Sequence, residues 1–400
     1  MIEWLSRVDP ARPFLRFQGQ VLTYGEALRE VESRRSREHR LLHPTLTPDS
    51  VLDLIAGLAG GGVTVVAPAP RLVGPTADLP AADLPPADLV VSTSGTSGPP
   101  KGVRLTNDNM TAAASASARH LGHGPDDVWL LAMPLHHVGG ISILVRQMYT
   151  GGAVTMLAEF EPAQFADAMR TSVSMVSVVP TMLHRIVDLG PFPGLRAVLV
   201  GGGPSPDGLL ESALGAGLPV LPTYGMTETF GQAATLRPGA PLERKAHPLP
   251  GVEMRIEPDG RIAVRGDQVS PGYLGEPDRP DPWFTTNDIG TLDADGAVRV
   301  LGRADTMIVT GGENVAPEQV EIELRRHPDV VDVVVVGAPD PEWGEIVTCF
   351  YVGSPSGDDL AAWVSEHLAG FMVPKRWKRL ESIPRTDMGK PDRRALSSSD

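Results

Sequence analysis

The chain has 400 residues, 42% hydrophobic and 21% charged, a balance typical of a soluble globular protein with two or three domains. Forty-nine acidic against 35 basic residues give a net charge of −14, which argues against nucleic-acid binding. A single cysteine, Cys349, excludes an internal disulfide, and the sequence shows no zinc-like Cys/His spacing, signal peptide or membrane-spanning run, so we expect a cytoplasmic protein.

Strands and helices are predicted to alternate through the middle of the chain. Segment 71–88 is rich in proline, alanine and aspartate and predicts a surface connection. The apolar runs predict strands at 88–92, 153–157, 175–179 and 195–200. Helices are predicted at 107–120, with Thr106 as the N-cap, and at 180–189. This alternation indicates a largely parallel sheet that is covered on both faces.

The last third of the chain has a different pattern. Short strands are predicted at 261–265 and 297–301, between turns rich in glycine and aspartate. Beyond Asp305, the pattern predicts a helix from Pro317 to before Pro328, a β-branched strand at 332–337 and a helix at 360–368. We therefore expect two domains, residues 1–304 and residues 305–400.

A loop rich in hydroxyl groups and glycine follows the strand predicted at 88–92 and is closed by a lysine, in the sequence STSGTSGPPKG from Ser92 to Gly102. Glycines allow several backbone N–H groups to point at one anion, while the hydroxyls and the lysine add donors and positive charge. Such a loop suits a triphosphate. Gly102 rather than Ser or Thr follows Lys101, which disfavours a Walker-type NTPase. A flexible linker is the alternative interpretation.

The loop resembles the phosphate loop of the acyl-adenylate-forming superfamily, which includes acyl-CoA synthetases, luciferases and peptide-synthetase adenylation domains. Four further blocks follow in the order of that family: YGMTET at 224–229, TNDIG at 286–290, GRAD through GGENVAP at 302–317, and PRTDMGK at 384–390. The resemblance covers the chain from about residue 88 to its end. It implies an α/β fold with a large N-terminal domain of layered mixed and parallel sheets with helices, and a small mobile α+β C-terminal domain.

The resemblance implies that the N-terminal domain binds ATP with Mg²⁺. It assigns Glu228 to the metal, Asp288 to the ribose hydroxyls and Tyr224 to the adenine ring. The full set of ATP- or AMP-binding residues implied is Thr93, Ser94, Gly95, Thr96, Ser97, Gly98, Lys101, Gly201, Gly202, Gly203, Tyr224, Gly225, Met226, Thr227, Asp288 and Arg303. Taken singly, Glu228 could be a solvated surface residue, and Asp288 and the three glycines could belong to ordinary turns.

The resemblance also implies catalytic residues and a second substrate, CoA. Lys390 is the implied cation that stabilises the transition state, together with Glu228, Thr227 and His137. Asp305 matches the hinge residue about which the small domain rotates. Gly311 and Gly312 leave room for the pantetheine arm of CoA.

The stretch PLHHVGGISILVR at 134–146 bears on the acid that is activated. His137 matches a position that gates the acyl pocket in relatives. If the stretch is helical, Ser142 and Arg146 share one face. An arginine in an apolar helix needs an anion, which is either an internal Asp or Glu or a second carboxylate on the substrate. The stretch resembles the o-succinylbenzoate–CoA ligases of menaquinone synthesis, in which a basic residue here binds the aromatic carboxylate.

The sequence therefore predicts an acid–thiol ligase that converts o-succinylbenzoate, ATP and CoA to o-succinylbenzoyl-CoA, AMP and diphosphate through an acyl-adenylate. The expected partners are these small molecules, with no nucleic acid and no membrane span, and a homodimer is left open. The alternatives are another aryl or fatty acyl-CoA ligase, a stand-alone adenylation domain that loads a carrier protein, and a non-enzymatic binding module. The last is disfavoured because each block retains its functional residue.

Overall fold

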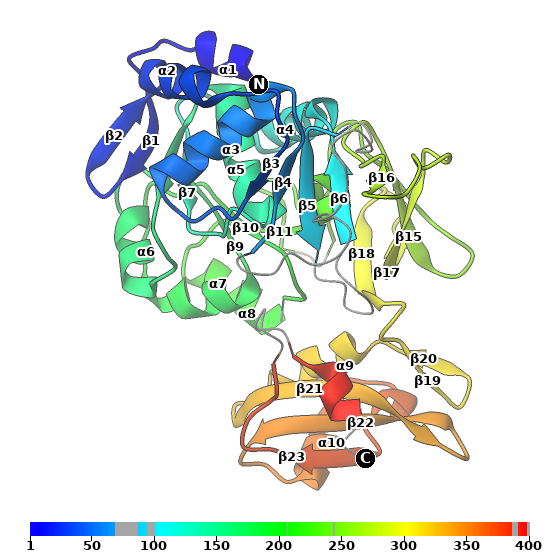
Figure 1. Cartoon of the computed structure of the whole chain (residues 1–400). Helices are drawn as coiled ribbons and strands as arrows, with labels where there is room; N and C mark the ends of the chain where they lie inside the picture. Colours follow the sequence, from blue (N-terminus) through cyan, green and yellow to red (C-terminus); the bar gives the residue numbers. More distant parts are fainter. Residues whose placement is uncertain (69–86, 94–100, 206, 243–244, 386–390, 398–400) are drawn as a thin grey trace.

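The computed structural model describes the chain outside residues 69–86, 94–100, 206, 243–244, 386–390 and 398–400 (Figure 1). It has a large N-terminal domain and a smaller C-terminal one, which Figure 1 shows as the yellow-to-red elements beyond β18 (Val298–Arg303). None of the helices in the described ranges has the length and apolar character that crossing a bilayer requires.

A nine-stranded sheet forms the centre of the large domain. Its order is β13 (His247–Pro248), β12 (Gly231–Thr235), β11 (Val220–Met226), β10 (Ala197–Val200), β9 (Met175–Val178), β7 (Val128–Leu131), β8 (Ala153–Met156), β1 (Pro13–Phe17) and β2 (Gln20–Thr23). The strands from β11 to β1 run parallel, and antiparallel strands close both edges. Every residue of β7 and β10 is buried, as in sheets covered on both faces.

Two further sheets complete the large domain. One has the order β16 (Gly272–Tyr273), β6 (Lys101–Leu105), β5 (Leu89–Thr93), β4 (Thr64–Val66) and β3 (Arg40–Leu42). The other is antiparallel, with the order β14 (Glu253–Ile256), β15 (Arg261–Arg265), β17 (Phe284–Leu292) and β18. Figure 1 shows this last sheet on the side of the large domain from which the chain continues into the small one.

Helices cover both faces of the nine-stranded sheet. One hydrophobic core joins the face that carries Trp129 and Leu131 to α3 (Pro48–Gly60), α4 (Asn107–Leu121) and α5 (Val138–Thr150). A second core joins the opposite face, with Leu130, to α6 (Pro162–Met169), α7 (Pro180–Ile186) and α8 (Asp207–Gly215). Adjacent residues of β7 thus enter different cores, as the two-residue period of a strand requires. The helices α1 (Ile2–Ser6) and α2 (Tyr24–Arg34) lie near the N-terminus.

The small domain is built on one sheet, in the order β20 (Glu313–Val315), β19 (Ile308–Thr310), β22 (Gly344–Gly353) and β21 (Val330–Asp340), with β23 (Arg376–Arg379) parallel to β22. Val333 and Val335 pack with α9 (Pro317–Leu324) and α10 (Gly357–Ser365), while Val334 and Val336 pack toward α11 (Arg393–Ser397). Both faces of the sheet are therefore covered.

The structure confirms the predicted elements and shifts some of their ends. Thr106 caps α4 as expected, and Asn109 completes the capping box. The helix predicted at 180–189 is α7 followed by a 3₁₀ turn, η2 (Val187–Leu189). The strand predicted at 332–337 is longer, because β21 pairs with β22 well beyond its β-branched run. The connection predicted at 71–88 falls almost wholly outside the described residues, and the domain boundary at 304/305 stays a prediction.

Candidate functional site

The hydroxyl- and glycine-rich loop connects two paired strands. It leaves β5 at Thr93 and returns to β6 at Lys101, which lies opposite Thr93 in the antiparallel ladder. The Thr93 hydroxyl donates to the Lys101 carbonyl oxygen at 3.1 Å. The exposed Lys101 ammonium lies 4.6 Å from the centre of the Tyr273 ring and 3.7 Å from the Glu276 carboxylate. The remaining predicted ligands of the loop lie outside the described residues: Ser94, Gly95, Thr96, Ser97 and Gly98.

The second motif runs from the end of β11 into the 3₁₀ turn η3 (Thr227–Thr229). Gly225 is required by packing, because a Cβ there would lie 1.7 Å from the Gly231 carbonyl oxygen on the neighbouring strand. The Met226 N–H donates to the Thr229 hydroxyl at 3.2 Å, and this bond fixes the turn. Thr227 and Glu228 therefore follow directly on the carboxyl end of a parallel strand, where α/β proteins usually bind ligands.

Glu228 is half-buried and is held through both its side chain and its backbone. The Tyr273 hydroxyl donates to Glu228 Oε1 at 2.8 Å. The Glu228 carbonyl oxygen accepts a bond of 2.7 Å from the Ser270 N–H. Within the described part of the chain, no lysine or arginine forms an ion pair with this carboxylate, so its charge remains to attract a cation.

Tyr224, Asp288, Arg303 and Asp305 form one connected polar cluster. The Tyr224 hydroxyl donates to Asp288 Oδ2 at 2.8 Å, and Arg303 Nη1 lies 3.4 Å from Asp288 Oδ1. Burial raises the pKa of Asp288 above its ordinary value. Arg303 also binds both carboxylate oxygens of Asp305, at 2.9 and 3.1 Å, and these bonds are the main cause of its raised pKa. The predicted ribose ligand is thus linked to the predicted hinge residue through one arginine.

Different structural features account for glycine at positions 201, 202 and 203, directly after β10. A Cβ on Gly201 would lie 2.7 Å from the Thr223 side chain on β11. Gly202 has a φ of +77°, which favours glycine. Gly203 has no heavy atom near the place of a Cβ, so packing does not explain it. The open space above Gly203 is compatible with a ligand that approaches the backbone.

Arg146 is buried in α5 without a counter-ion among the described residues. Its residue is 4% exposed, and no carboxylate of the described residues pairs with it. Burial alone lowers the pKa of its guanidinium, to about 9, which leaves it charged at neutral pH. The guanidinium carbon lies 5.3 Å from the centre of the Trp129 ring. Of the two partners predicted for Arg146, an internal salt bridge is not found among the described residues, and the role in binding a substrate carboxylate stays a prediction.

Gly231 lies beside the side chains of Ser142 and Arg146 on α5. It has a φ of +97°, and a Cβ there would lie 3.4 Å from Arg146 Nη2 and 3.6 Å from Ser142 Oγ. Ser142 donates to the Gly139 carbonyl oxygen at 3.2 Å, and His137 is the N-cap residue of the helix. The structure thus brings Ser142 and Arg146 beside the strand that follows Glu228. Gly231 could not be recognised as a site residue from the sequence, because it lies beside Ser142 and Arg146 only through the contact between α5 and β12.

His123 is a second residue that sequence reasoning missed. It is 5% exposed, and neither ring nitrogen has a hydrogen-bond partner among the described residues. Its ring meets Trp129 edge-on, with 5.4 Å between the ring centres. Burial, and then the positive charge of Arg146, lower the pKa of His123 to about 4. A neutral histidine and a charged arginine therefore both lie against the Trp129 ring.

Gly311 and Gly312 form the two-residue turn of the β19–β20 hairpin. Their φ angles are +59° and +85°, and two positive values are what a type I′ turn requires. The Gly311 N–H donates to the Trp343 carbonyl oxygen at 2.9 Å. Trp343 is 38% exposed, and the Lys375 ammonium lies 3.2 Å from the centre of its ring. The positive φ angles of the turn thus favour glycine at both positions, whether or not a ligand binds there.

Lys390 lies outside the described residues, but the residues on both sides of its segment are described. Arg385 and Pro391 form an isolated antiparallel bridge. On the following helix, Arg393 Nη1 donates to Glu321 Oε1 at 2.6 Å. The described residues Arg385 and Pro391 thus pair with each other, and Arg393 joins α11 to α9.

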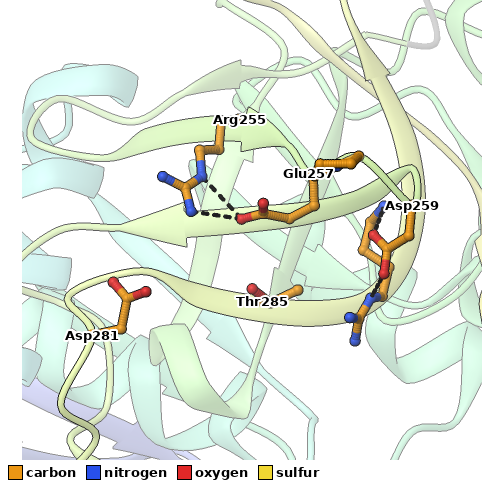
Figure 2. Close-up of a pocket in the computed structure, with 7 residues that line it drawn as sticks. Arg255, Glu257, Asp259, Asp281 and Thr285 are labelled. Carbon is orange, nitrogen blue, oxygen red and sulfur yellow. Dashed lines mark hydrogen bonds and ion pairs between the residues drawn. The ribbon is translucent and has the colours of Figure 1, made fainter.

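Figure 2 shows a separate surface hollow of about 380 Å³ on the antiparallel sheet of the large domain. Its two arginines already bind neighbouring carboxylates: Arg255 donates to Glu257 at 2.8 Å and Arg261 to Asp259 at 2.7 Å. None of the predicted site residues lines it. We therefore do not regard it as the candidate site.

Two family models match the chain. The AMP-binding enzyme model matches residues 53–274, and the model of the AMP-binding enzyme C-terminal domain matches residues 319–390. Together they include the loop closed by Lys101, the turn with Glu228 and the segment that ends at Lys390.

Individual relatives and solved structures agree with these matches. The 2-succinylbenzoate–CoA ligase of Bacillus mycoides is 38% identical in an alignment of 331 positions, which covers 77% of this chain and 69% of the relative. The o-succinylbenzoate CoA synthetase of Bacillus subtilis, in complex with the acyl-adenylate intermediate OSB-AMP, is 26% identical with a TM-score of 0.86. The same enzyme in complex with ATP and a magnesium ion gives a TM-score of 0.85 at 26% identity. Both alignments cover 100% of this chain and 98% of the other.

Proposed function

The chain belongs to the AMP-binding enzyme family, and from this premise we propose that it is an ATP-dependent 2-succinylbenzoate–CoA ligase. The observation that carries the choice of acid is Arg146, a buried arginine without an internal carboxylate partner among the described residues. 2-Succinylbenzoate has two carboxylates. One reacts with ATP, and the other is the anion that Arg146 lacks within the protein.

The reaction has two steps that use the same site. In the first, an oxygen of the succinyl carboxylate attacks the α-phosphorus of ATP, the bond to the β-phosphate oxygen breaks, and diphosphate leaves. In the second, the sulfur of CoA, having lost its proton, attacks the acyl carbon, and AMP leaves with the electron pair of the broken C–O bond. Both reacting groups of the first step are anionic, so the site must neutralise charge and align the partners.

Residues from three parts of the large domain are suited to holding the nucleotide. Lys101 begins β6 and Thr227 directly follows β11, in the positions expected for phosphate ligands, and Asp288 lies within β17. Asp288 has a carboxylate oriented by the Tyr224 hydroxyl, and it can accept hydrogen bonds from ribose hydroxyls. A Cβ on Gly203 would meet no heavy atom within 4 Å, so its backbone is open to a ligand. We assign the adenosine to this region.

The residues present fit Mg²⁺, which would supply charge neutralisation on the phosphates when bound. Mg²⁺ in nucleotide enzymes is held by one or two carboxylates together with phosphate oxygens and water, rather than by a cage of protein ligands. In the described residues no group of three or more His, Cys, Asp or Glu side chains is arranged for a metal. Glu228, a carboxylate without an ion pair among the described residues, can be the one protein carboxylate that such a site needs.

We assign the aromatic carboxylate of the substrate to Arg146, with Ser142 beside it and His137 at the start of the same helix. The planar guanidinium can bind both oxygens of a carboxylate. Gly231 leaves space next to both side chains, and it follows Glu228 by three residues. In this assignment the aromatic end of the acid lies beside α5 and its reactive end is directed toward the phosphates.

The second step needs the small domain. Lys390 is the cation that we assign to the first step, and Gly311 and Gly312 are the residues that we assign to the path of the CoA thiol. Asp305 is the residue about which the small domain turns between the steps. Its bidentate bond with Arg303, which also approaches Asp288, gives the hinge a direct link to the nucleotide site.

One assay distinguishes this function from its alternatives. Release of diphosphate and release of AMP are both measured with 2-succinylbenzoate, with a monocarboxylic analogue that lacks the ring carboxylate, and with a fatty acid, each with and without CoA. We expect strong preference for the dicarboxylic acid and a CoA thioester as the product. Preference for the analogue or the fatty acid would indicate another acyl-CoA ligase, and adenylate formation without transfer to CoA would indicate a domain that loads a carrier protein.

A further inference from the structure

Tyr273 contacts both of the charged groups that we assign to the phosphates. Its hydroxyl donates to Glu228 Oε1 at 2.8 Å, and its ring lies 4.6 Å below the Lys101 ammonium. We propose that Tyr273 is a positioning residue that orients Glu228 for the metal and Lys101 for the phosphates. This inference rests on the proposed function only in taking Mg²⁺·ATP as the ligand of the site.

The hydrogen bond from Tyr273 makes the two carboxylate oxygens of Glu228 inequivalent. Oε1 is occupied by the Tyr273 hydroxyl, so Oε2 is the oxygen that remains for a metal. A hydrogen bond to a ligating carboxylate fixes the orientation of the ligand and typically changes metal affinity 10–100-fold when it is lost.

The ring of Tyr273 acts on the other charged group. A cation within about 6 Å of an aromatic centroid is attracted to the ring face. Lys101 has a second neighbour, the Glu276 carboxylate at 3.7 Å, but both of these side chains are more than half exposed, and such pairs are weak. The aromatic face therefore restricts where the flexible lysine can lie, while a phosphate can still displace Glu276.

Backbone hydrogen bonds join Tyr273 to the elements that carry its two partners. Its two-residue strand β16 pairs with β6, which begins at Lys101, and the Leu274 N–H donates to the Gly102 carbonyl oxygen at 2.8 Å. On the other side, the Ser270 N–H donates to the carbonyl oxygen of Glu228 at 2.7 Å. Residues 270–274 thus connect β6, which carries Lys101, to the 3₁₀ turn η3, which carries Glu228. Within this segment, the Tyr273 side chain contacts both charged groups.

The test uses the full chain and reads nucleotide and metal binding directly. Mn²⁺ serves as a paramagnetic probe for the metal, titrated into protein saturated with ATP, and ATP binding is measured by calorimetry in the absence of divalent metal. Tyr273→Phe removes the hydroxyl and keeps the ring, while Tyr273→Leu removes both. Tyr24→Phe is the control, since Tyr24 is a fully buried tyrosine whose hydroxyl donates to the Gln147 and Gly152 carbonyl oxygens, away from these groups.

We expect Tyr273→Phe to weaken Mn²⁺ binding about 10-fold or more and to leave metal-free ATP binding unchanged. Tyr273→Leu should in addition weaken metal-free ATP binding, because Lys101 loses the ring. Tyr24→Phe should change neither affinity, even if its melting temperature falls. Wild-type Mn²⁺ affinity in Tyr273→Phe, with thermal melting showing it folded, would overturn the proposal. Because no acyl substrate is present, this result is independent of whether 2-succinylbenzoate is the acid.

Discussion

Replacing Arg146 by methionine should separate substrate recognition from stability. Arg146 is 4% exposed and lacks a carboxylate partner among the described residues, so the free protein carries a buried charge without an ion pair. Replacing a buried charge by an apolar side chain of similar length is often neutral or stabilising. We therefore expect Arg146→Met to be folded, with a melting temperature no lower than that of the wild type.

The loss of recognition should nevertheless be large. Removing one partner of a buried, hydrogen-bonded charge pair costs about 2–5 kcal/mol. Since Arg146 is almost fully enclosed, we expect the upper part of this range, roughly 3–5 kcal/mol, which corresponds to a fall of about 150- to 5,000-fold in kcat/KM for 2-succinylbenzoate. The monocarboxylic analogue has no ring carboxylate to lose, so its kcat/KM should fall less than about 10-fold.

The assay is steady-state AMP release with both acids, run beside thermal melting. Arg104→Met is the matched control, because Arg104 is fully buried but lies 2.8 Å from a carboxylate of the protein itself, Asp278. It should affect the two acids equally. Equal losses for both acids in Arg146→Met, accompanied by a lower melting temperature, would refute the assignment and make Arg146 a structural residue.

Three further predictions address the small domain and the acid stability of the fold. Lys390→Ala should slow adenylate formation about 100- to 1,000-fold and largely spare thioester formation from preformed acyl-adenylate, which rapid-quench assays of the separate steps will show. Asp305→Pro should stop one of these steps and spare the other, because proline fixes φ; Asp305→Ala, which also loses the bonds to Arg303, is the control. The pKa of His123 falls on folding to about 4, so the unfolded chain binds its proton more tightly, and this residue lowers the free energy of unfolding as pH falls from about 6.5 to 4, by up to about 3 kcal/mol. Urea unfolding of His123→Phe should show a correspondingly weaker pH dependence over that range, and an unchanged dependence would contradict the pKa.

Much of the fold follows from local sequence. The helix α4 begins after a threonine that caps it, and the capping box lies within four residues. The capping role of Thr106 can therefore be predicted without the rest of the chain. Gly311 and Gly312 are equally local, since a tight hairpin turn needs two positive φ angles whatever surrounds it. The order of the five sequence blocks likewise indicated the family, because each block is a short contiguous segment.

The tertiary structure decided how the residues of the site support one another. Tyr273 lies 45 residues from Glu228, and Tyr224 lies 64 residues from Asp288, so no local pattern could pair them. For Arg146 the sequence allowed two partners, and the choice depended on every carboxylate that the fold could have brought near it. Burial and the absence of a counter-ion are properties of the packed whole, because both depend on which distant segments enclose a side chain. The sequence therefore determined which chemical groups are present, and the packing of the sheets determined which of them meet.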